Sequence, residues 1–168
     1  AIQIATEIIN LFEKKYEEKW INMMRDKLGL FGVDEKDKFL ILDLLTWMHQ
    51  NKVDYTNTFC HLMNIKVQKN EKFKDKDFQN WKKRWEKRLK NNNHNTTDSI
   101  KLMRSVNPIV IPRNHKIEEA IKSAEKNNFK LVTQIIEVLS KPYVKQKNIL
   151  NYQIPSTSNE KYQTFCGT

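Results

Sequence analysis

The sequence predicts an all-α fold of about seven helices, and three observations favour it. Apolar residues recur at three- and four-residue steps through most of the chain, which is the spacing of a helix that buries one face. The alternation typical of a half-buried strand is limited to residues 109–111. Asp residues precede several apolar runs, where their carboxylates can accept hydrogen bonds from the first helical turn.

The first predicted helix covers residues 2–28 and ends at Gly29, which suits a left-handed cap. Asp34 is the expected N-cap of a second helix, and Asp54 of a short third helix. The apolar stripe of the first helix comprises Ile2, Ala5, Ile9, Phe12, Tyr16, Trp20 and Met23. The buried faces of the next two are expected to comprise Leu40, Leu44, Leu45 and Met48, and then Tyr55, Phe59, Leu62 and Met63.

Residues 66–76 are polar and are expected to form a loop. Asp75 or Asp77 then opens a fourth helix, whose aligned apolar residues are Phe78, Trp81, Trp85 and Leu89. The Asn-rich residues 91–95 offer no apolar anchor, so they predict a mobile connection. A brief fifth helix, carrying Ile100, Met103 and Val106, must stop before Pro108, because proline disfavours helical geometry in the residue ahead of it.

Pro112 is expected in the first turn of a sixth helix, where its missing N–H costs nothing. A seventh helix follows Asn128 and runs up to Pro142. The apolar positions of these two helices are Ile117, Ala120, Ile121 and Ala124, and then Phe129, Val132, Ile135, Ile136 and Leu139. Periodicity fades from Tyr143 onward. The sequence therefore predicts a helical region over residues 1–142 and an extended tail over residues 143–168.

The composition favours a protein with a large solvated surface. The net charge is +10, and five of the 30 basic residues are Arg, so 25 are Lys. Nucleic-acid surfaces favour Arg, whose planar fork matches phosphates and guanine edges. Neither a nucleic-acid partner nor a membrane is therefore expected, and the densest apolar run, residues 39–45, is far shorter than the ~18 residues of a membrane span. Two cysteines in 168 residues indicate a reducing compartment.

The residue patterns predict no catalytic centre in this chain. The chain has three glycines, of which only Gly29 and Gly32 are close in sequence, whereas a phosphate-binding loop needs several close together. The four histidines are scattered and show no metal-ligand spacing. Cys60 is interpreted as a small packing residue. Trp81 and Trp85 lie among Lys and Arg residues and so resemble a platform for single-stranded nucleic acid, but their four-residue spacing favours a buried helix face. The charges between Asp34 and Asp37 are interpreted as solvated surface.

Cys166 is a different case, because it lies third from the last residue, after a segment rich in Pro, Ser and Thr. A thiol on a mobile terminus is accessible, which is the first requirement for redox reactivity. From its spacing alone, a redox thiol and an incidental exposed cysteine are equally good interpretations.

Several stretches, in order and over essentially the whole chain, resemble the C-terminal part of the selenoprotein O family. The stretches are residues 24–30 (Met-Arg-Asp-Lys-Leu-Gly-Leu), residues 54–59 (Asp-Tyr-Thr-Asn-Thr-Phe), Trp81 and Trp85 with Arg88, residues 106–108 (Val-Asn-Pro), Arg113 with Asn114, Ala120-Ile121 with Ala124-Glu125, and residues 139–143. The resemblance implies a protein-kinase-like fold in the parent protein. It also implies an enzyme that uses ATP and Mg²⁺ to transfer AMP to Ser, Thr or Tyr hydroxyls of proteins.

The same resemblance implies that the nucleotide- and metal-binding residues lie upstream of this chain. The segment is then expected to lack the active site, to bind no cofactor itself and to pack on the upstream kinase-like core. Family members carry selenocysteine or cysteine third from the end, where it is thought to bond to a cysteine of the core. Cys166 is thereby implied to be a redox-regulatory thiol. The implied location is mitochondrial in a eukaryote and cytoplasmic otherwise.

A stand-alone, non-catalytic helical module that binds proteins is the alternative. The two hypotheses differ in what the isolated chain should do. A self-sufficient module unfolds cooperatively as a monomer, whereas a piece of a larger domain exposes an apolar patch and self-associates. The second behaviour is the expected one.

Overall fold

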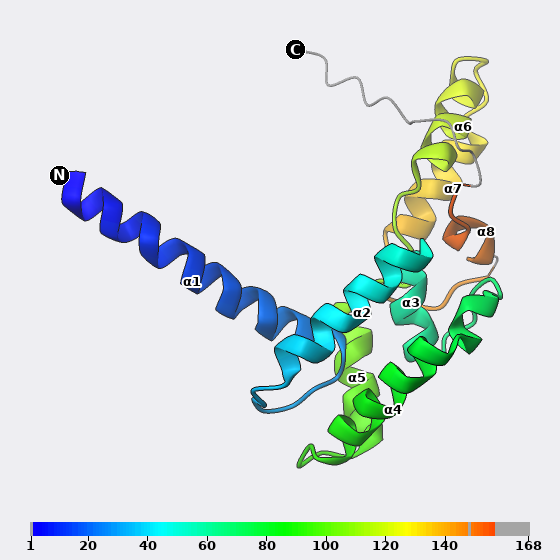
Figure 1. The fold of residues 1–168 in the computed structure, drawn as a ribbon. Coiled ribbons are helices and arrows are strands. Elements are labelled where there is room, and N and C mark those ends of the chain that lie inside the picture. Colours follow the sequence, from blue (N-terminus) through cyan, green and yellow to red (C-terminus); the bar gives the residue numbers. More distant parts are fainter. Residues whose placement is uncertain (1, 148, 157–168) are drawn as a thin grey trace.

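The computed structural model describes residues 2–147 and 149–156, and every regular element within them is helical (Figure 1). The helices are α1 (Ile2–Lys27), α2 (Asp37–Asn51), α3 (Tyr55–Leu62), the 3₁₀ helix η1 (Glu71–Lys74), α4 (Lys76–Lys90), α5 (Thr96–Val106), α6 (Asn114–Ala124), α7 (Lys130–Leu139) and α8 (Leu150–Gln153). The predicted all-α fold is confirmed. Of the described α-helices, α1 to α7 have eight residues or more, in line with the expected number.

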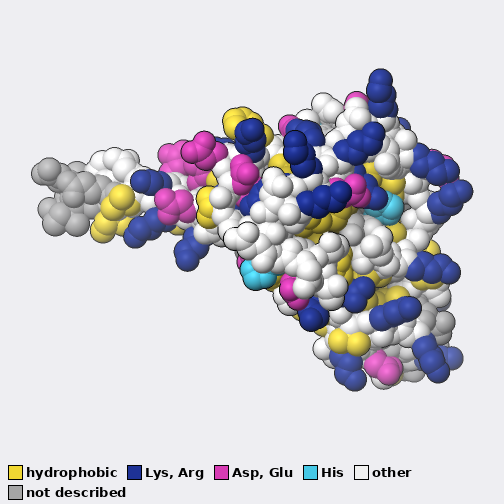
Figure 2. Space-filling model, turned by 90° about the horizontal axis from the view of Figure 1, so that it is seen from below, with side chains coloured by type: hydrophobic (Ala, Val, Ile, Leu, Met, Phe, Trp, Pro, Cys, Tyr) yellow, Lys and Arg dark blue, Asp and Glu magenta, His cyan; other side chains and the backbone are white. Residues whose placement is uncertain are grey.

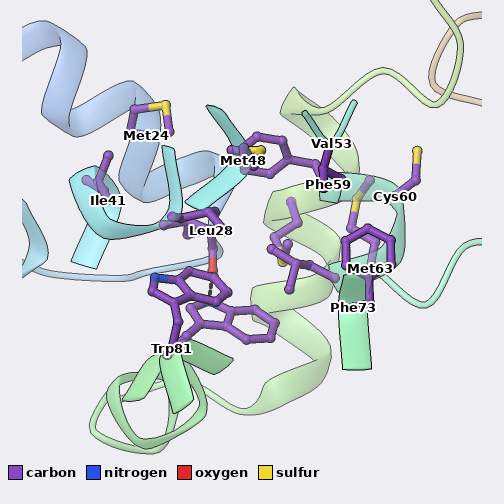
Figure 3. Packing of buried hydrophobic residues seen from close by; sticks show 14 of the residues in the cluster. Met24, Leu28, Ile41, Met48, Val53, Phe59, Cys60, Met63, Phe73 and Trp81 are labelled. Atoms are coloured by element: carbon purple, nitrogen blue, oxygen red, sulfur yellow. Dashed lines mark hydrogen bonds between the residues drawn. The ribbon is translucent and has the colours of Figure 1, made fainter. Parts of the chain in front are cut away.

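The core lies where the C-terminal end of α1 meets α2, α4 and α5, with α3 and η1 closing one side. Figure 3 shows side chains of this cluster, in which Leu28, Ile41 and Phe59 are almost completely buried. The helices α6 and α7 pack mainly on each other as a hairpin. The N-terminal half of α1 projects away from the rest of the molecule, on the side opposite the hairpin (Figure 1).

The predicted caps at three helix ends are confirmed. Gly29 has a φ of 69°. Its N–H donates to Asp26 O at 3.0 Å, and the N–H of Leu30 donates to Arg25 O at 2.9 Å, so the end of α1 is a Schellman motif. Asp54 accepts from the N–H of Asn57 and caps α3, while Asp75 rather than Asp77 caps α4.

Two predicted helix starts were wrong by two or three residues. Asp34 does not cap α2, because residues 34–36 form a turn and the helix begins at Asp37. Pro112 is not in the first turn of α6. The helix begins at Asn114, because Arg113 has an extended backbone, with a φ of −97° and a ψ of 123°.

Two segments predicted as irregular are more ordered than expected. Within residues 66–76, η1 carries Phe73 into the core, where the centroid of its ring lies 3.9 Å from the centroid of the His61 ring. Within residues 91–95, Asn92 is buried and Asn95 caps α5. The predicted loop and the predicted mobile connection are therefore both corrected. Each polar segment contains one residue that is buried in the body, Phe73 in the first and Asn92 in the second.

Several apolar positions are exposed. Over residues 8–19 of α1, every side chain is exposed, and these residues include Ile9, Phe12 and Tyr16 of its apolar stripe. Ile121, Phe129 and Ile136 on the α6–α7 hairpin are also exposed, whereas Ala120 and Val138 are buried. The expectation that Ile121 faces inward was wrong.

Part of the predicted extended tail is folded. The short helix α8 lies against the core through Ile149 and Gln153, both of which are buried. The amide nitrogen of Gln153 donates to Ile109 O at 2.6 Å, deep in the structure. Residues 157–168 lie outside the described part of the chain.

Candidate functional site

The two cysteines differ in what the structure says of them. Cys166 lies outside the described residues, so its predicted redox role stays a prediction. Cys60 is fully buried, with its Sγ 3.9 Å from Ile109 O (Figure 3). Burial, together with the nearby Asp54 carboxylate, raises the pKa of the Cys60 thiol to about 11. The interpretation of Cys60 as a packing residue is confirmed, because a thiol this weakly acidic forms almost no nucleophilic thiolate near neutral pH.

Trp81 and Trp85 belong to the core. Their rings stack with centroids 6.0 Å apart and planes 8° from parallel. Each indole N–H donates to a backbone carbonyl, from Trp81 to Leu40 O at 2.8 Å and from Trp85 to Leu28 O at 2.9 Å. Both side chains are buried, so the buried-face interpretation is confirmed and neither ring is available to stack on a base.

One side chain of α4, one of the α4–α5 connection and one of the residue that follows α5 hold the end of α1. A helix end leaves carbonyl oxygens without intrahelical partners. Here Lys27 O accepts from Asn107 Nδ2 at 2.9 Å, Leu28 O from the Trp85 indole, and Gly29 O from Asn92 Nδ2 at 3.1 Å. We call these three donor residues, Trp85, Asn92 and Asn107, the α1 collar. It fixes the last turn of α1 relative to the body of the molecule.

A buried carboxylate lies beside the collar. Asp37 is 1% exposed and accepts from Arg25 Nε at 2.7 Å and from Arg88 Nε at 2.8 Å. Burial alone raises the pKa of a carboxyl group, but here hydrogen bonds from Arg88, Arg25 and the Asp34 N–H outweigh it and hold the pKa of Asp37 below its usual value. Arg88 also donates to Phe31 O at 3.1 Å. The interpretation of Asp37 as solvated surface was wrong.

A second polar cluster joins α3, the start of α6 and α8. Arg113 forms a two-pronged pair with Asp54, at 2.6 and 2.9 Å. The carbonyl oxygen of Gln153 accepts from Arg113 at 3.1 Å and from Asn57 Nδ2 at 3.0 Å. Since these partners lie up to 96 residues apart, the cluster fastens the C-terminal helix to the body of the protein.

The residues that carry the family resemblance are largely the residues of these contacts. Arg25, Asp54, Arg88, Asn107 and Arg113 all belong to the quoted stretches. Arg25 links α1 to α2, and the other four link elements that are 51 to 80 residues apart in sequence. Their geometry supports helix-to-helix fastening, because their charged groups face each other or backbone carbonyls. Sequence reasoning missed this arrangement. The available signal was the position of these polar and charged residues beside helix ends.

Two further findings concern the described residues. No three His, Cys, Asp or Glu side chains among them lie close enough together to hold a metal ion. None of the described helices combines the length and the apolar character that crossing a membrane requires.

Comparison with known proteins identifies the family. The model of the family described as protein adenylyltransferase SelO matches residues 2–140. Among curated proteins, the protein nucleotidyltransferase YdiU of Pelagibacter ubique is 50% identical over 169 residues, covering 100% of this chain and 35% of the relative.

The protein nucleotidyltransferases YdiU of Alcanivorax borkumensis and Clostridium perfringens are 44% and 40% identical, and each match covers 100% of this chain. The first of these matches covers 35% of the relative's length and the second 34%. The chain thus spans about a third of the length of the curated relatives that it matches. With 139 of its residues covered by one family model, the chain belongs to the SelO family of protein adenylyltransferases.

Proposed function

We propose that the chain is the C-terminal helical region of an enzyme that transfers AMP from ATP to Ser, Thr or Tyr hydroxyls of proteins. The observation that carries the proposal is the match of the whole chain, at 50% identity, to about a third of a protein nucleotidyltransferase. The remaining two-thirds of such a protein is assigned the active site. In this proposal ATP and Mg²⁺ bind there, and residues 1–168 support that catalytic core.

The polar clusters favour a structural role for this region, because their arginines are paired within it. Arg25 and Arg88 are occupied by Asp37, and Arg113 is occupied by Asp54 and a backbone carbonyl. A phosphate-binding arginine must present free N–H groups to its ligand. Pairs of this kind instead fix the relative positions of helices, which suits a scaffold that a catalytic core packs on.

We further propose that Cys166 is the regulatory thiol of this enzyme. Gln153 fixes the chain on the body, and Cys166 lies 13 positions further along, so the thiol can reach at most about 45 Å from that anchor. A core cysteine within that radius can pair with it. The reaction oxidises both thiols to a disulfide and reduces a small-molecule disulfide, such as oxidised glutathione, to two thiols.

The proposed activity is tested with the full-length protein, Mg²⁺, protein substrates and ATP labelled on either the α- or the γ-phosphate. Label from α-labelled ATP should become covalently bound to protein, should be lost when Mg²⁺ is chelated, and should not transfer from γ-labelled ATP. Transfer of the γ-label would mean phosphorylation, and no transfer of either label would refute the proposal.

The alternative, a protein-binding module without catalysis, is favoured by one feature. A cleft of about 720 Å³ lies between the end of α3 and the α8 region. Ile109, Ile149 and Tyr143 line it, with Lys66 and Arg104 at its edge. This second function would be supported if the full-length protein transfers no label but binds acidic peptides. Charge reversal at Lys66 and Arg104 should then abolish that binding.

A further inference from the structure

The exposed half of α1 carries an apolar face. Ile8, Ile9, Phe12, Tyr16 and Met23 are between 43% and 68% exposed. At about 100° per residue, these five positions fall within an arc of roughly 100°. The Phe12 and Tyr16 rings stack with centroids 6.0 Å apart. Between residues 8 and 23, Lys19 is the only charged residue whose position falls in that arc. We call these five residues the α1 face.

This helix requires a partner to be stable. Residues 8–19 span three turns in which every side chain is exposed, and isolated helices of this length are marginal in water. Most helical stability in proteins comes from packing an apolar face. Figure 2 shows hydrophobic side chains on the projecting arm of α1, beside charged ones. Soluble monomers rarely leave such a continuous apolar surface uncovered.

We propose that the α1 face docks on the part of the same polypeptide that precedes residue 1. This inference rests on the proposed function, in which residues 1–168 are the C-terminal region of a longer enzyme. About two-thirds of the length of the curated relatives lies outside the matched part, which is ample to cover one helix face. A covalently linked segment is also present at an effective concentration in the millimolar range, so it outcompetes a second copy at micromolar concentration.

Docking through this face also defines how the catalytic part is positioned. The α1 collar holds the last turn of α1 on the body through the carbonyls of Lys27, Leu28 and Gly29. The helix is about 39 Å long from its 26 residues. A segment docked on its first half is therefore held at a set distance and angle from the core around α2, α4 and α5.

The test is cysteine accessibility in the full-length protein. Phe12→Cys and Tyr16→Cys place a thiol in the α1 face. Lys14→Cys is the matched control, because position 14 is exposed and lies on the opposite side of the same helix. Each variant is reacted with a maleimide, and labelling at each position is quantified by peptide mass mapping. Circular dichroism establishes that each variant is as helical as the wild type, and Ile9→Cys replaces any that is not.

We expect Phe12→Cys and Tyr16→Cys to be labelled at least about tenfold more slowly than Lys14→Cys in monomeric protein, at every protein concentration. Equal labelling rates at the three positions would overturn the proposal. Protection that disappears on dilution would also overturn it, since a second copy would then be the partner.

AMP transfer from α-labelled ATP is measured on the same preparations to separate this inference from the proposed function. Protected thiols without transfer would refute the catalytic proposal and leave the docking intact. Transfer with fully reactive thiols at positions 12 and 16 would refute the docking and leave the catalytic proposal intact.

Discussion

The replacement Asp37→Asn should strongly destabilise the fold. The carboxylate accepts from Arg25 Nε at 2.7 Å, from Arg88 Nε and Nη2 at 2.8 and 3.2 Å, and from the Asp34 N–H at 3.1 Å. Removing one partner of a buried ion pair typically costs 3–5 kcal/mol, because the other charge stays buried and unpaired. Both arginine side chains are slightly exposed, at 13% and 11%, and can partly rehydrate. We therefore expect a loss of about 3 kcal/mol, or roughly a hundredfold in the folding equilibrium.

Native-state hydrogen exchange of the backbone amides of α2 and α4 in the full-length protein, which reports the free energy of opening of this region, measures this loss. The matched control is Asp43→Asn, which removes an Asp43–Arg84 pair whose side chains are 48% and 56% exposed. Exposed pairs contribute little, so the control should change the free energy of unfolding by no more than about 0.5 kcal/mol. If the two variants are equally stable, the argument from burial is wrong.

The pH dependence of that difference is a second check. The pKa of Asp37 is lower in the folded protein than its usual value of 3.8. The carboxylate therefore stabilises the fold at pH values above about 4, and its contribution is lost as the pH falls through the folded-state pKa. The free-energy difference between wild type and Asp37→Asn should accordingly be constant near neutral pH and shrink below about pH 4. A difference that grows with acidification would contradict the assignment.

Three further predictions concern other parts of the chain. Gln153→Ala removes the hydrogen bond that anchors α8 and should accelerate proteolysis after α7 by about tenfold, whereas an unchanged rate would mean that α8 is held by its apolar contacts. In native protein at pH 8, a maleimide should modify Cys166 and spare Cys60, whose thiol has a pKa of about 11; modification of both would contradict the burial of Cys60. Gly29→Ala should lower the free energy of unfolding by about 2 kcal/mol or more, measured by thermal or urea unfolding, because its Cβ would lie 2.8 Å from a carbonyl oxygen of α5. Gly32→Ala should cost less, because its Cβ would have nothing within 4 Å. Equal losses in the two variants would refute the steric argument.

The sequence predicted the helices well because their signals are local. Asp54 and Asp75 cap the helices that follow them, and Gly29 closes α1, because each acts through backbone groups within a few residues. The starts of α2 and α6 were misplaced for the opposite reason. Asp37 and Arg113, at these two helix starts, pair with residues 51 and 59 positions away, and local sequence signals do not reveal such partners.

The polar contacts were harder to predict because charge pattern does not reveal burial. Asp37 stands in a run of alternating charges that is typical of solvated surface, and Asn92 stands in an Asn-rich stretch that is typical of a loop. Each is buried because a distant donor or acceptor satisfies it, Arg88 for Asp37 and Gly29 O for Asn92. Only the family resemblance singled out Arg88, and it did so without saying what Arg88 contacts.

The exposed half of α1 shows a different limit of sequence reasoning. A helical period states that one face is apolar, but it does not state which element covers that face. Over residues 8–19 of α1 every side chain is exposed, whereas the last turn of the same helix is held by Trp85, Asn92 and Asn107. A helix that is held at its C-terminal end and docked through an apolar face nearer its N-terminus fixes the position of the docked segment relative to the core around α2, α4 and α5. If the proposed function is right, loosening the collar with Asn107→Ala should therefore slow AMP transfer by the full-length protein, although the side-chain hydrogen bonds of Asn107 go to Lys27 and Met103 of this region.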